Sequence, residues 1–298
     1  MRVAGLTDLA CTIDGTPLIG DGASLRCGHG HSFDRARDGY WNLVVVQHKA
    51  SSDPGDSKEM VTARRRFLNT GLYSPIAAHV FETVRDLAVS TRRADGDARA
   101  FTIADAGCGE GYYLQRLVEL AAQSSDTAAL RLAGFDVSKW AVQAAAKRRA
   151  NDGAPLPVRW LVANNRRPPF AAQSIDLMLC LFGFPVWEGF RAAQAQGGAV
   201  LLIDPGPDHL IELRRIIYPD VTQTEPQSIE RAAASGYWLV RTETVRFSIE
   251  LETREAVQDL VAMTPHAHRM PEAGRMALAA IDRLLVTVDV VARLLTLD

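Results

Sequence analysis

The feature that most constrains the fold is a glycine-rich turn, Asp105–Gly111 (DAGCGEG), between an apolar run and a helical pattern. The run Phe101–Ala106 predicts a β-strand, and the pattern after the turn predicts a helix over Leu114–Ala122. Glycine at every second position lets the backbone turn sharply and lie flat against a ligand. The helix that follows offers free N–H groups and the positive end of its dipole. The turn is therefore a candidate ligand site, with Asp105 and Gly107 among its contact residues.

Strands and helices go on alternating after this turn. We expect a helix over Ser138–Ala150, and strands over Leu130–Asp136, Val158–Val162, Ile175–Phe182 and Ala199–Asp204. Such alternation predicts an α/β fold with a doubly wound, Rossmann-like sheet. Two later runs, Tyr237–Leu251 and Leu284–Val291, could supply closing antiparallel strands.

The 298 residues divide into three predicted parts. Residues 1–40 form a small module of short strands and turns, 41–98 a connecting strand and helices, and 99–298 the α/β domain. In the connecting part, Asp56 can cap a helix, with Glu59 in the capping-box position. A second helix should run from about Pro75 to Ser90. With 47% hydrophobic residues, the chain has enough apolar material for a full core.

The N-terminal module carries side chains that are typical metal ligands. Cys11, Asp14, Cys27 and His31 have the spacing C-x2-D…C-x3-H, which resembles a structural zinc ribbon. Asp14 stands where a thiolate is expected, and a carboxylate is a harder, less usual structural ligand. Two interpretations stay open: a zinc site, with His29 as a substitute ligand, or a finger held by its small apolar core alone.

Two polar residues follow later strands of the predicted sheet. Asp136 ends the second strand, where an acidic group can accept hydrogen bonds from both hydroxyls of a ribose. The alternative is that Asp136 caps the next helix. Asn164 follows the third strand, where its amide could face an adenine, although asparagine is also a common turn residue.

The charge and the cysteine content limit which partners the protein can have and in which cellular compartment it works. The formal net charge is -2, so any surface for RNA has to be local. Arg64–Arg66 could contact RNA phosphates or could be a solvated helix face. The apolar stretches fall short of a bilayer span, and the four cysteines lack disulfide-framework spacing. We therefore expect a cytoplasmic protein without a membrane partner.

The turn at 105–111 resembles motif I of class I S-adenosylmethionine-dependent methyltransferases. Over nearly its whole length the chain resembles the 23S ribosomal RNA (guanine-N1)-methyltransferase family, which joins an N-terminal zinc module to such a domain. The most specific match is the block from Gln47 to Ser57 (QHK…DPGDS). Further matching stretches include Ser32–Asp34, Ala63–Arg65, Asp136–Lys139, Pro205–Pro207 and Met263–Pro265.

This resemblance implies roles for single residues. Those matching positions that contact S-adenosylmethionine are Tyr73, Gly109, Glu110 and His209. Those matching the zinc ligands are Cys11, Asp14, Cys27 and His31, although the family has a cysteine at the second position. The chain also departs at Phe182–Pro185, where the family has Tyr-Ala-Pro, so the pocket for the target base should differ in detail.

The implied reaction is methylation of guanine N1 in a hairpin loop of 23S ribosomal RNA. Whether two copies of the protein form a homodimer stays open. Guanine N1 must lose a proton, so a general base is useful. The sequence identifies none, and Asp204 and Asp34 are only candidates. Phe182 and Phe184 could hold a splayed base or belong to the core. The alternatives are a methyltransferase of the same fold for another RNA or a small molecule, and a non-catalytic RNA-binding protein with a relic pocket.

Overall fold

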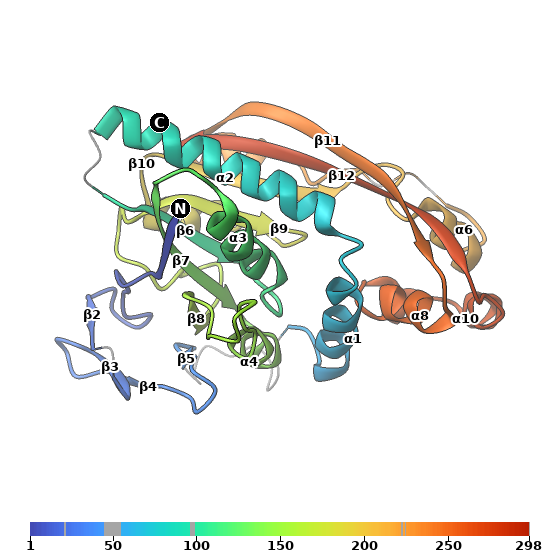
Figure 1. The fold of residues 1–298 in the computed structure, drawn as a ribbon, viewed down its shortest axis with the longest axis horizontal. Helices are drawn as coiled ribbons and strands as arrows, with labels where there is room; N and C mark the ends of the chain where they lie inside the picture. Colours follow the sequence, from blue (N-terminus) through green and yellow to red (C-terminus); the bar gives the residue numbers. More distant parts are fainter. Residues whose placement is uncertain (21, 45–54, 96–98, 222, 224, 298) are drawn as a thin grey trace.

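The computed structural model describes residues 1–20, 22–44, 55–95, 99–221, 223 and 225–297 (Figure 1). The block from Gln47 to Ser57, which carries the most specific match to the family, is described only in part, because Gln47–Lys49 and Asp53-Pro54 lie outside the described residues. The end of the apolar strand expected after Trp41 also lies outside them.

The described strands of the main domain form one nine-stranded sheet. Its order is β11 (Tyr237–Leu251), β12 (Leu284–Leu297), β10 (Gln194–Pro205), β9 (Ile175–Leu181), β6 (Phe101–Ala106), β7 (Ala129–Asp136), β8 (Arg159–Val162) and β5 (Trp41–Asn42). Neighbours from β10 to β5 are parallel, whereas β12 is antiparallel to both β10 and β11. β1 (Arg2–Gly5) pairs in parallel with the first half of β7. The predicted doubly wound sheet with closing antiparallel strands is confirmed.

Alternate side chains of the strands build a core on each face of the sheet, because successive residues of a strand point to opposite faces. Ile103 and Leu177 belong to one apolar cluster, with α2 (Ser74–Asp95), α3 (Tyr112–Gln123) and α4 (Lys139–Ala146). Ala104 and Met178 belong to the other, with α5 (Trp187–Ala193) and α7 (Glu230–Ala234). Both faces are covered, as a parallel sheet requires.

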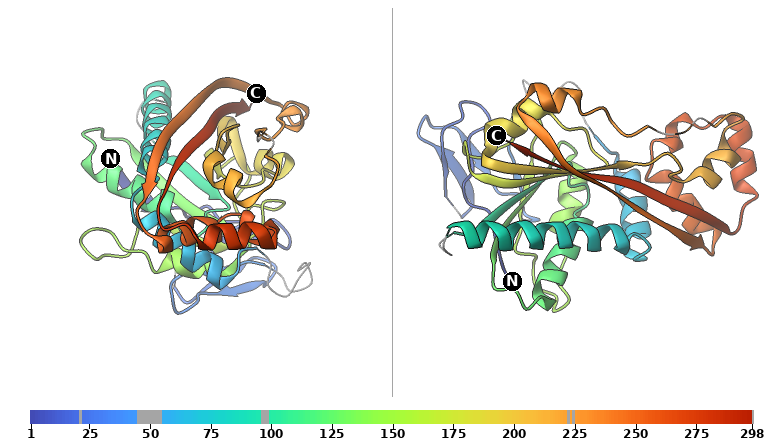
Figure 2. Two further views of the ribbon diagram at one scale, coloured as in Figure 1. Left: turned by 90° about the vertical axis from the view of Figure 1, so that its right-hand side faces the viewer. Right: turned by 90° about the horizontal axis from the view of Figure 1, so that it is seen from above.

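The remaining helices gather where β11 and β12 extend beyond the other strands (Figures 1 and 2). Here α1 (Lys58–Asn69) packs against α8 (Arg254–Ala262), and α6 (Ile211–Ile217) packs against α10 (Glu272–Ala279). The short α9 (His266–Arg269) adjoins α8. No helix among the described residues combines the length and apolarity needed to cross a membrane.

The N-terminal module is a three-stranded antiparallel sheet of β2 (Leu18–Ile19), β3 (Ser24–Cys27) and β4 (Ser32–Asp34). Its buried side chains Leu25 and Phe33 share an apolar cluster with Phe135 of β7. The module is therefore packed on the sheet rather than tethered to it, and residues 2–5 of the same segment are part of the central sheet as β1.

Helix ends differ from the predictions in two places. The N-cap of α1 is Ser57, whose Oγ accepts the N–H of Met60 at 3.3 Å, and not Asp56, whose carboxylate forms an ion pair with Arg64. Helix α4 ends at Ala146, four residues earlier than expected, because Arg148 turns inward to bind the glycine turn. Both differences come from contacts with residues distant in the sequence.

Candidate cofactor pocket and metal centre

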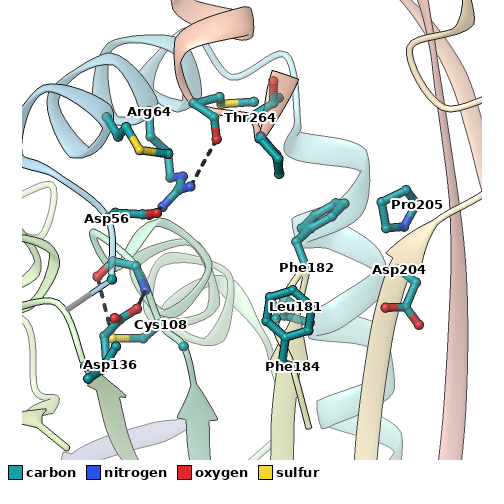
Figure 3. A pocket seen from close by; sticks show the side chains of 18 of the residues that line it. Asp56, Arg64, Cys108, Asp136, Leu181, Phe182, Phe184, Asp204, Pro205 and Thr264 are labelled. Carbon is teal, nitrogen blue, oxygen red and sulfur yellow. Dashed lines mark hydrogen bonds and ion pairs between the residues drawn. The ribbon is translucent and has the colours of Figure 1, made fainter. Parts of the chain in front are cut away.

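A cavity of about 1830 Å³ opens at the carboxyl ends of β6, β7, β8 and β9. The sheet order changes direction between β6 and β9, and ligands of doubly wound sheets bind at such a switch point. Figure 3 shows Asp56, Arg64 and Asp136 on one side of this cavity and Phe182, Phe184 and Asp204 on the other. All eight cofactor-contact residues expected from the sequence line it: Tyr73, Asp105, Gly107, Gly109, Glu110, Asp136, Asn164 and His209.

The glycine turn gives the cavity a bare backbone surface. Gly107, Gly109 and Gly111 all have positive φ, the left-handed conformation that glycine adopts without strain. A Cβ on Gly107 would meet nothing within 4 Å, so this backbone faces open space. A Cβ on Gly111 would lie 2.8 Å from the Trp160 ring, so this glycine lets α3 approach the sheet. The turn thus combines a ligand-facing glycine with a packing glycine.

Asp136 ties the turn to the next strand. One carboxylate oxygen accepts the N–H of Gly109 at 3.0 Å, and the other accepts the N–H of Ser138 at 2.8 Å. Burial raises its pKa, although these two hydrogen bonds oppose the shift. The helix-cap alternative is wrong, because the N-cap of α4 is Ser138, whose Oγ accepts the N–H of Ala141. A carboxylate can accept further hydrogen bonds, so Asp136 stays suited to a ribose.

Several buried polar atoms near the turn have no hydrogen-bond partner within the described residues. They include Oδ1 of Asp105 and the hydroxyl of Tyr73, together with Oε1 of Glu110 and the hydroxyl of Tyr112. Burial, with the nearby charge of Asp136, raises the pKa of Asp105 to about 8. Leaving a buried polar group unpaired is costly, which points to a polar ligand at this end of the cavity. The cationic ammonium and sulfonium of S-adenosylmethionine fit such an acidic wall.

Glu110 lines the cavity, but its carboxylate is turned into the protein. It forms a buried ion pair with Arg148, whose Nε also donates to the carbonyl of Glu110 at 2.8 Å. A contact between Glu110 and a cofactor would therefore come from its backbone. The ion pair holds the turn against the end of α4.

His209 and Asn164 also use part of their hydrogen-bonding capacity within the chain. Burial lowers the pKa of His209 to about 4, so its ring is neutral at pH 7, and its Nδ1 accepts the N–H of Asp289 at 3.3 Å. The side-chain oxygen of Asn164 accepts the N–H groups of Arg166 and Arg167 in a turn. A contact of Asn164 with adenine would come from its NH₂ group.

The opposite wall is the loop after β9. Phe182 adopts a φ of 56°, which is unusual for a residue with a side chain and is typical of functional sites. Its ring packs near those of Tyr73 and His209, with centroids 6.5 and 6.0 Å away. Phe184 is 79% exposed, and its carbonyl accepts the side-chain NH₂ of Asn165 at 2.9 Å. Phe184 therefore does not belong to the core.

Neither candidate for the general base is free in this cavity. Asp204 lines it but forms a buried ion pair with Arg293 and accepts the side-chain NH₂ of Gln227 at 2.7 Å. Burial raises the pKa of Asp204, and Arg293 opposes the shift. Asp34 lies on β4 of the N-terminal module and is not among the described residues that line the cavity.

The arginines of α1 are all engaged within the chain. Arg64 pairs with Asp56, Arg65 donates to the carbonyl of Ala144 at 3.0 Å, and the Nε of Arg66 donates to Asp259 at 2.8 Å. The three side chains diverge, as expected for neighbours on a helix. Only Arg64 lines the cavity.

The four expected metal ligands come together in the N-terminal module. The ligand atoms of Cys11, Asp14, Cys27 and His31 all lie within 4.8 Å of one another. His31 Nδ1 is 3.6 and 3.3 Å from the two sulfurs and 3.0 Å from Asp14 Oδ2. Tetrahedral zinc with its usual bond lengths separates such ligands by about 3.3–3.6 Å, so the donor set fits the ion. His29 contacts the same oxygen of Asp14 at 2.9 Å but is not part of this group.

The fold and the cavity define a class I methyltransferase, and comparison with known proteins agrees. Residues 103–206 match the family model "Methyltransferase domain", and residues 9–52 match "RlmA, N-terminal", a zinc-ribbon model. A Micromonospora griseorubida protein named "Putative 23S rRNA (guanine-N(1)-)-methyltransferase" is 32% identical over 97% of this chain and 96% of its own length. The 23S rRNA (guanine(748)-N(1))-methyltransferase of Streptomyces fradiae is 29% identical over 91% and 90%. This chain belongs to the 23S rRNA (guanine-N1)-methyltransferase family.

Some cavity residues were not expected from the sequence. Asp56 and Arg64 line the glycine side, and Gln227 lines the far side, where its NH₂ group bridges Asp204 and the carbonyl of Gly183. The matches to the family at Gly55-Asp56 and at Met263–Pro265 were sequence signals for the first side, since these described residues line the cavity. Gln227 lies in a stretch without any motif, so no sequence signal indicated it.

Proposed function

We propose that this protein transfers the methyl group of S-adenosylmethionine to N1 of a guanine in a hairpin loop of 23S ribosomal RNA. The observation that carries the proposal is the size and the asymmetry of the cavity. Sites for one small molecule usually measure roughly 300–1,000 Å³. This cavity of about 1830 Å³ exceeds that range, with a polar glycine turn at one side and aromatic rings at the other. It has room for a cofactor and an entering nucleobase.

S-adenosylmethionine supplies an activated methyl group, and the chain supplies position. Asp136 accepts the ribose hydroxyls, and the NH₂ group of Asn164 faces the adenine. Gly107, Gly109 and the backbone of Glu110 pass along the methionine part. Asp105 and Tyr73, which each have an oxygen without a partner among the described residues, would receive its cationic groups. The neutral ring of His209 packs beside Phe182 and keeps a second positive charge away from the sulfonium.

The substrate side is the loop from Phe182 to Pro185. A guanine splayed from its hairpin would stack on aromatic rings, which contribute about 1–3 kcal/mol per base at single-stranded sites. Phe184 is exposed at this wall, and Arg166 and Arg167 of the neighbouring loop are exposed as well, so they could contact RNA phosphates. Methyl transfer needs in-line alignment, which such a stack provides. As the carbon–sulfur bond breaks, S-adenosylhomocysteine leaves as a neutral thioether, and the proton from N1 passes to water.

The N-terminal module would hold one structural zinc ion through Cys11, Asp14, Cys27 and His31 and present its surface to the RNA. The ion would stabilise the small sheet, which has few apolar side chains of its own. The enzyme would work in the cytoplasm, where its ribosomal RNA substrate is found. Pairing of two chains on one RNA is tested by light scattering of the protein with and without RNA.

The deciding experiment is methylation of unmodified 23S RNA with labelled S-adenosylmethionine, followed by primer extension. N1 methylation blocks Watson–Crick pairing, so reverse transcription should stop at one hairpin-loop guanine. A label without a stop would favour another position or another RNA. Turnover of a small molecule without any transfer to RNA would favour the small-molecule alternative, and absence of cofactor binding would favour a relic pocket.

A further inference from the structure

Arg64 of α1 lies directly over the glycine turn. Its Nη1 is 3.6 Å from the position that a Cβ on Gly109 would occupy, and its side chain lines the cavity. Figure 3 shows the guanidinium between Asp56 and the segment that carries Thr264. Arg64 is thus a cation beside the part of the turn where the methionine moiety of the cofactor would lie.

Two contacts fix the guanidinium in this position. It forms an ion pair with Asp56, and its Nη2 donates to the carbonyl of Met263 at 3.1 Å. Asp56 is held in turn, because Ser138 Oγ donates to its carbonyl at 2.7 Å. The neighbouring Gly55 packs so closely that an added Cβ would lie 2.9 Å from the Ser138 Cβ. The cation is therefore preorganised, which lowers the entropic cost of binding an anion.

The charges around the turn explain why a cation is needed there. Asp105 is buried and Asp136 is half-buried, and both acids suit the ammonium and the sulfonium of the cofactor but oppose its carboxylate. Arg148 is committed to Glu110, and Arg214 donates to the carbonyls of Pro207 and His209. The other arginines that line the cavity come from different elements, namely Arg166 and Arg167 after β8 and Arg269 in α9.

We propose that Arg64 binds the methionine carboxylate of S-adenosylmethionine and that Asp56 is its positioning residue. This inference rests on the proposed function, since it presumes the cofactor. A guanidinium can hold a carboxylate through two parallel N–H···O bonds, and such charge-assisted bonds are about twice as strong as neutral ones. Asp56 keeps the Arg64 side chain extended over Gly109. Loss of the Asp56 carboxylate should therefore weaken cofactor binding less than loss of the Arg64 guanidinium.

Two probes that differ in the amino-acid part of the cofactor separate this role from a structural one. S-adenosylhomocysteine carries the carboxylate, whereas 5′-methylthioadenosine lacks the whole aminocarboxylate end. By isothermal titration calorimetry, Arg64→Met should weaken binding of S-adenosylhomocysteine by about 10- to 100-fold. It should leave binding of 5′-methylthioadenosine within about twofold. The matched control is Arg65→Met on the same helix, which should change neither affinity.

The outcomes are distinct. Equal weakening of both probes would overturn the inference, because Arg64 would then act on the whole pocket, and so would no weakening of either. If Arg64→Met does not fold, Arg64→Lys keeps the charge and loses the fork, and it should weaken S-adenosylhomocysteine alone by a few-fold. Failure of the wild-type protein to bind S-adenosylhomocysteine would instead reject the proposed function.

Discussion

Binding of S-adenosylmethionine should release a proton from Asp105. Burial and the neighbouring Asp136 raise the pKa of Asp105 to about 8, and its Oδ1 has no partner among the described residues. At pH 7 a group with this pKa carries its proton in about nine of ten molecules. A cationic ligand beside the carboxyl favours the ionised form and lowers the pKa. About 0.9 proton should therefore leave per cofactor bound at pH 7, and about 0.1 at pH 9.

The pH dependence of affinity has a definite sign. Because binding favours the ionised acid, affinity should rise nearly tenfold per pH unit from pH 6 to pH 7 and level off above about pH 8. Calorimetry in buffers of different ionisation enthalpy measures the proton count as the slope of observed enthalpy against buffer enthalpy. Asp105→Asn is a suitable control, since the amide resembles the neutral acid that prevails at pH 7. It should bind more weakly and release almost no proton.

A slope near zero for the wild-type protein at pH 7 would refute this reasoning. An equal slope for the wild type and Asp105→Asn would mean that the proton comes from another group, of which Asp136 is the first candidate, since burial raises its pKa as well.

Three further predictions concern the packing around the site. Gly111→Ala should lower the free energy of unfolding by about 1–3 kcal/mol in urea titrations, because its φ is positive and a Cβ would press on Trp160; unchanged stability would contradict the tight approach of α3. Arg148→Met should cost about 3–5 kcal/mol by the same assay, since it leaves the Glu110 carboxylate buried and unpaired, and a loss below about 1 kcal/mol would argue against a buried pair. Asp14→Cys should bind zinc more tightly in chelator competition, and its cobalt form should gain a third thiolate charge-transfer contribution; spectra identical to the wild type would place residue 14 outside the ligand set.

Much of the fold could be predicted from the sequence, because its signals are local. The runs at Phe101–Ala106 and Tyr237–Leu251 have the residue pattern and bounds that the structure shows. The end of α4 could not be predicted, because Arg148 leaves the helix to reach Glu110, 38 residues away in the chain. The cap of α1 was misassigned for the same reason, since Asp56 finds Arg64 as its partner and Ser57 takes the cap.

The candidate site also has parts that could be predicted from the sequence and parts that could not. Glycines at 107, 109 and 111 indicate a tight turn with positive φ, so the turn could be predicted. The residues that follow neighbouring strands could be predicted too, because ligands of such sheets bind at the carboxyl ends of the strands. Side-chain direction was not. The sequence placed Glu110 and Asp204 at the site, but both carboxylates are turned to arginines, Arg148 and Arg293, that only the folded chain brings near. Conversely, the sequence did not indicate which of the adjacent arginines Arg64, Arg65 and Arg66 faces the cavity, and in the structure it is Arg64.

The most direct test of the central claim is a crystal structure of the protein with S-adenosylhomocysteine. We predict the ribose hydroxyls at Asp136, the amino-acid part along Gly107 and Gly109, and the sulfur directed across the cavity toward Phe182. A ligand bound elsewhere, or a cavity closed by side chains at 105–111, would contradict the account.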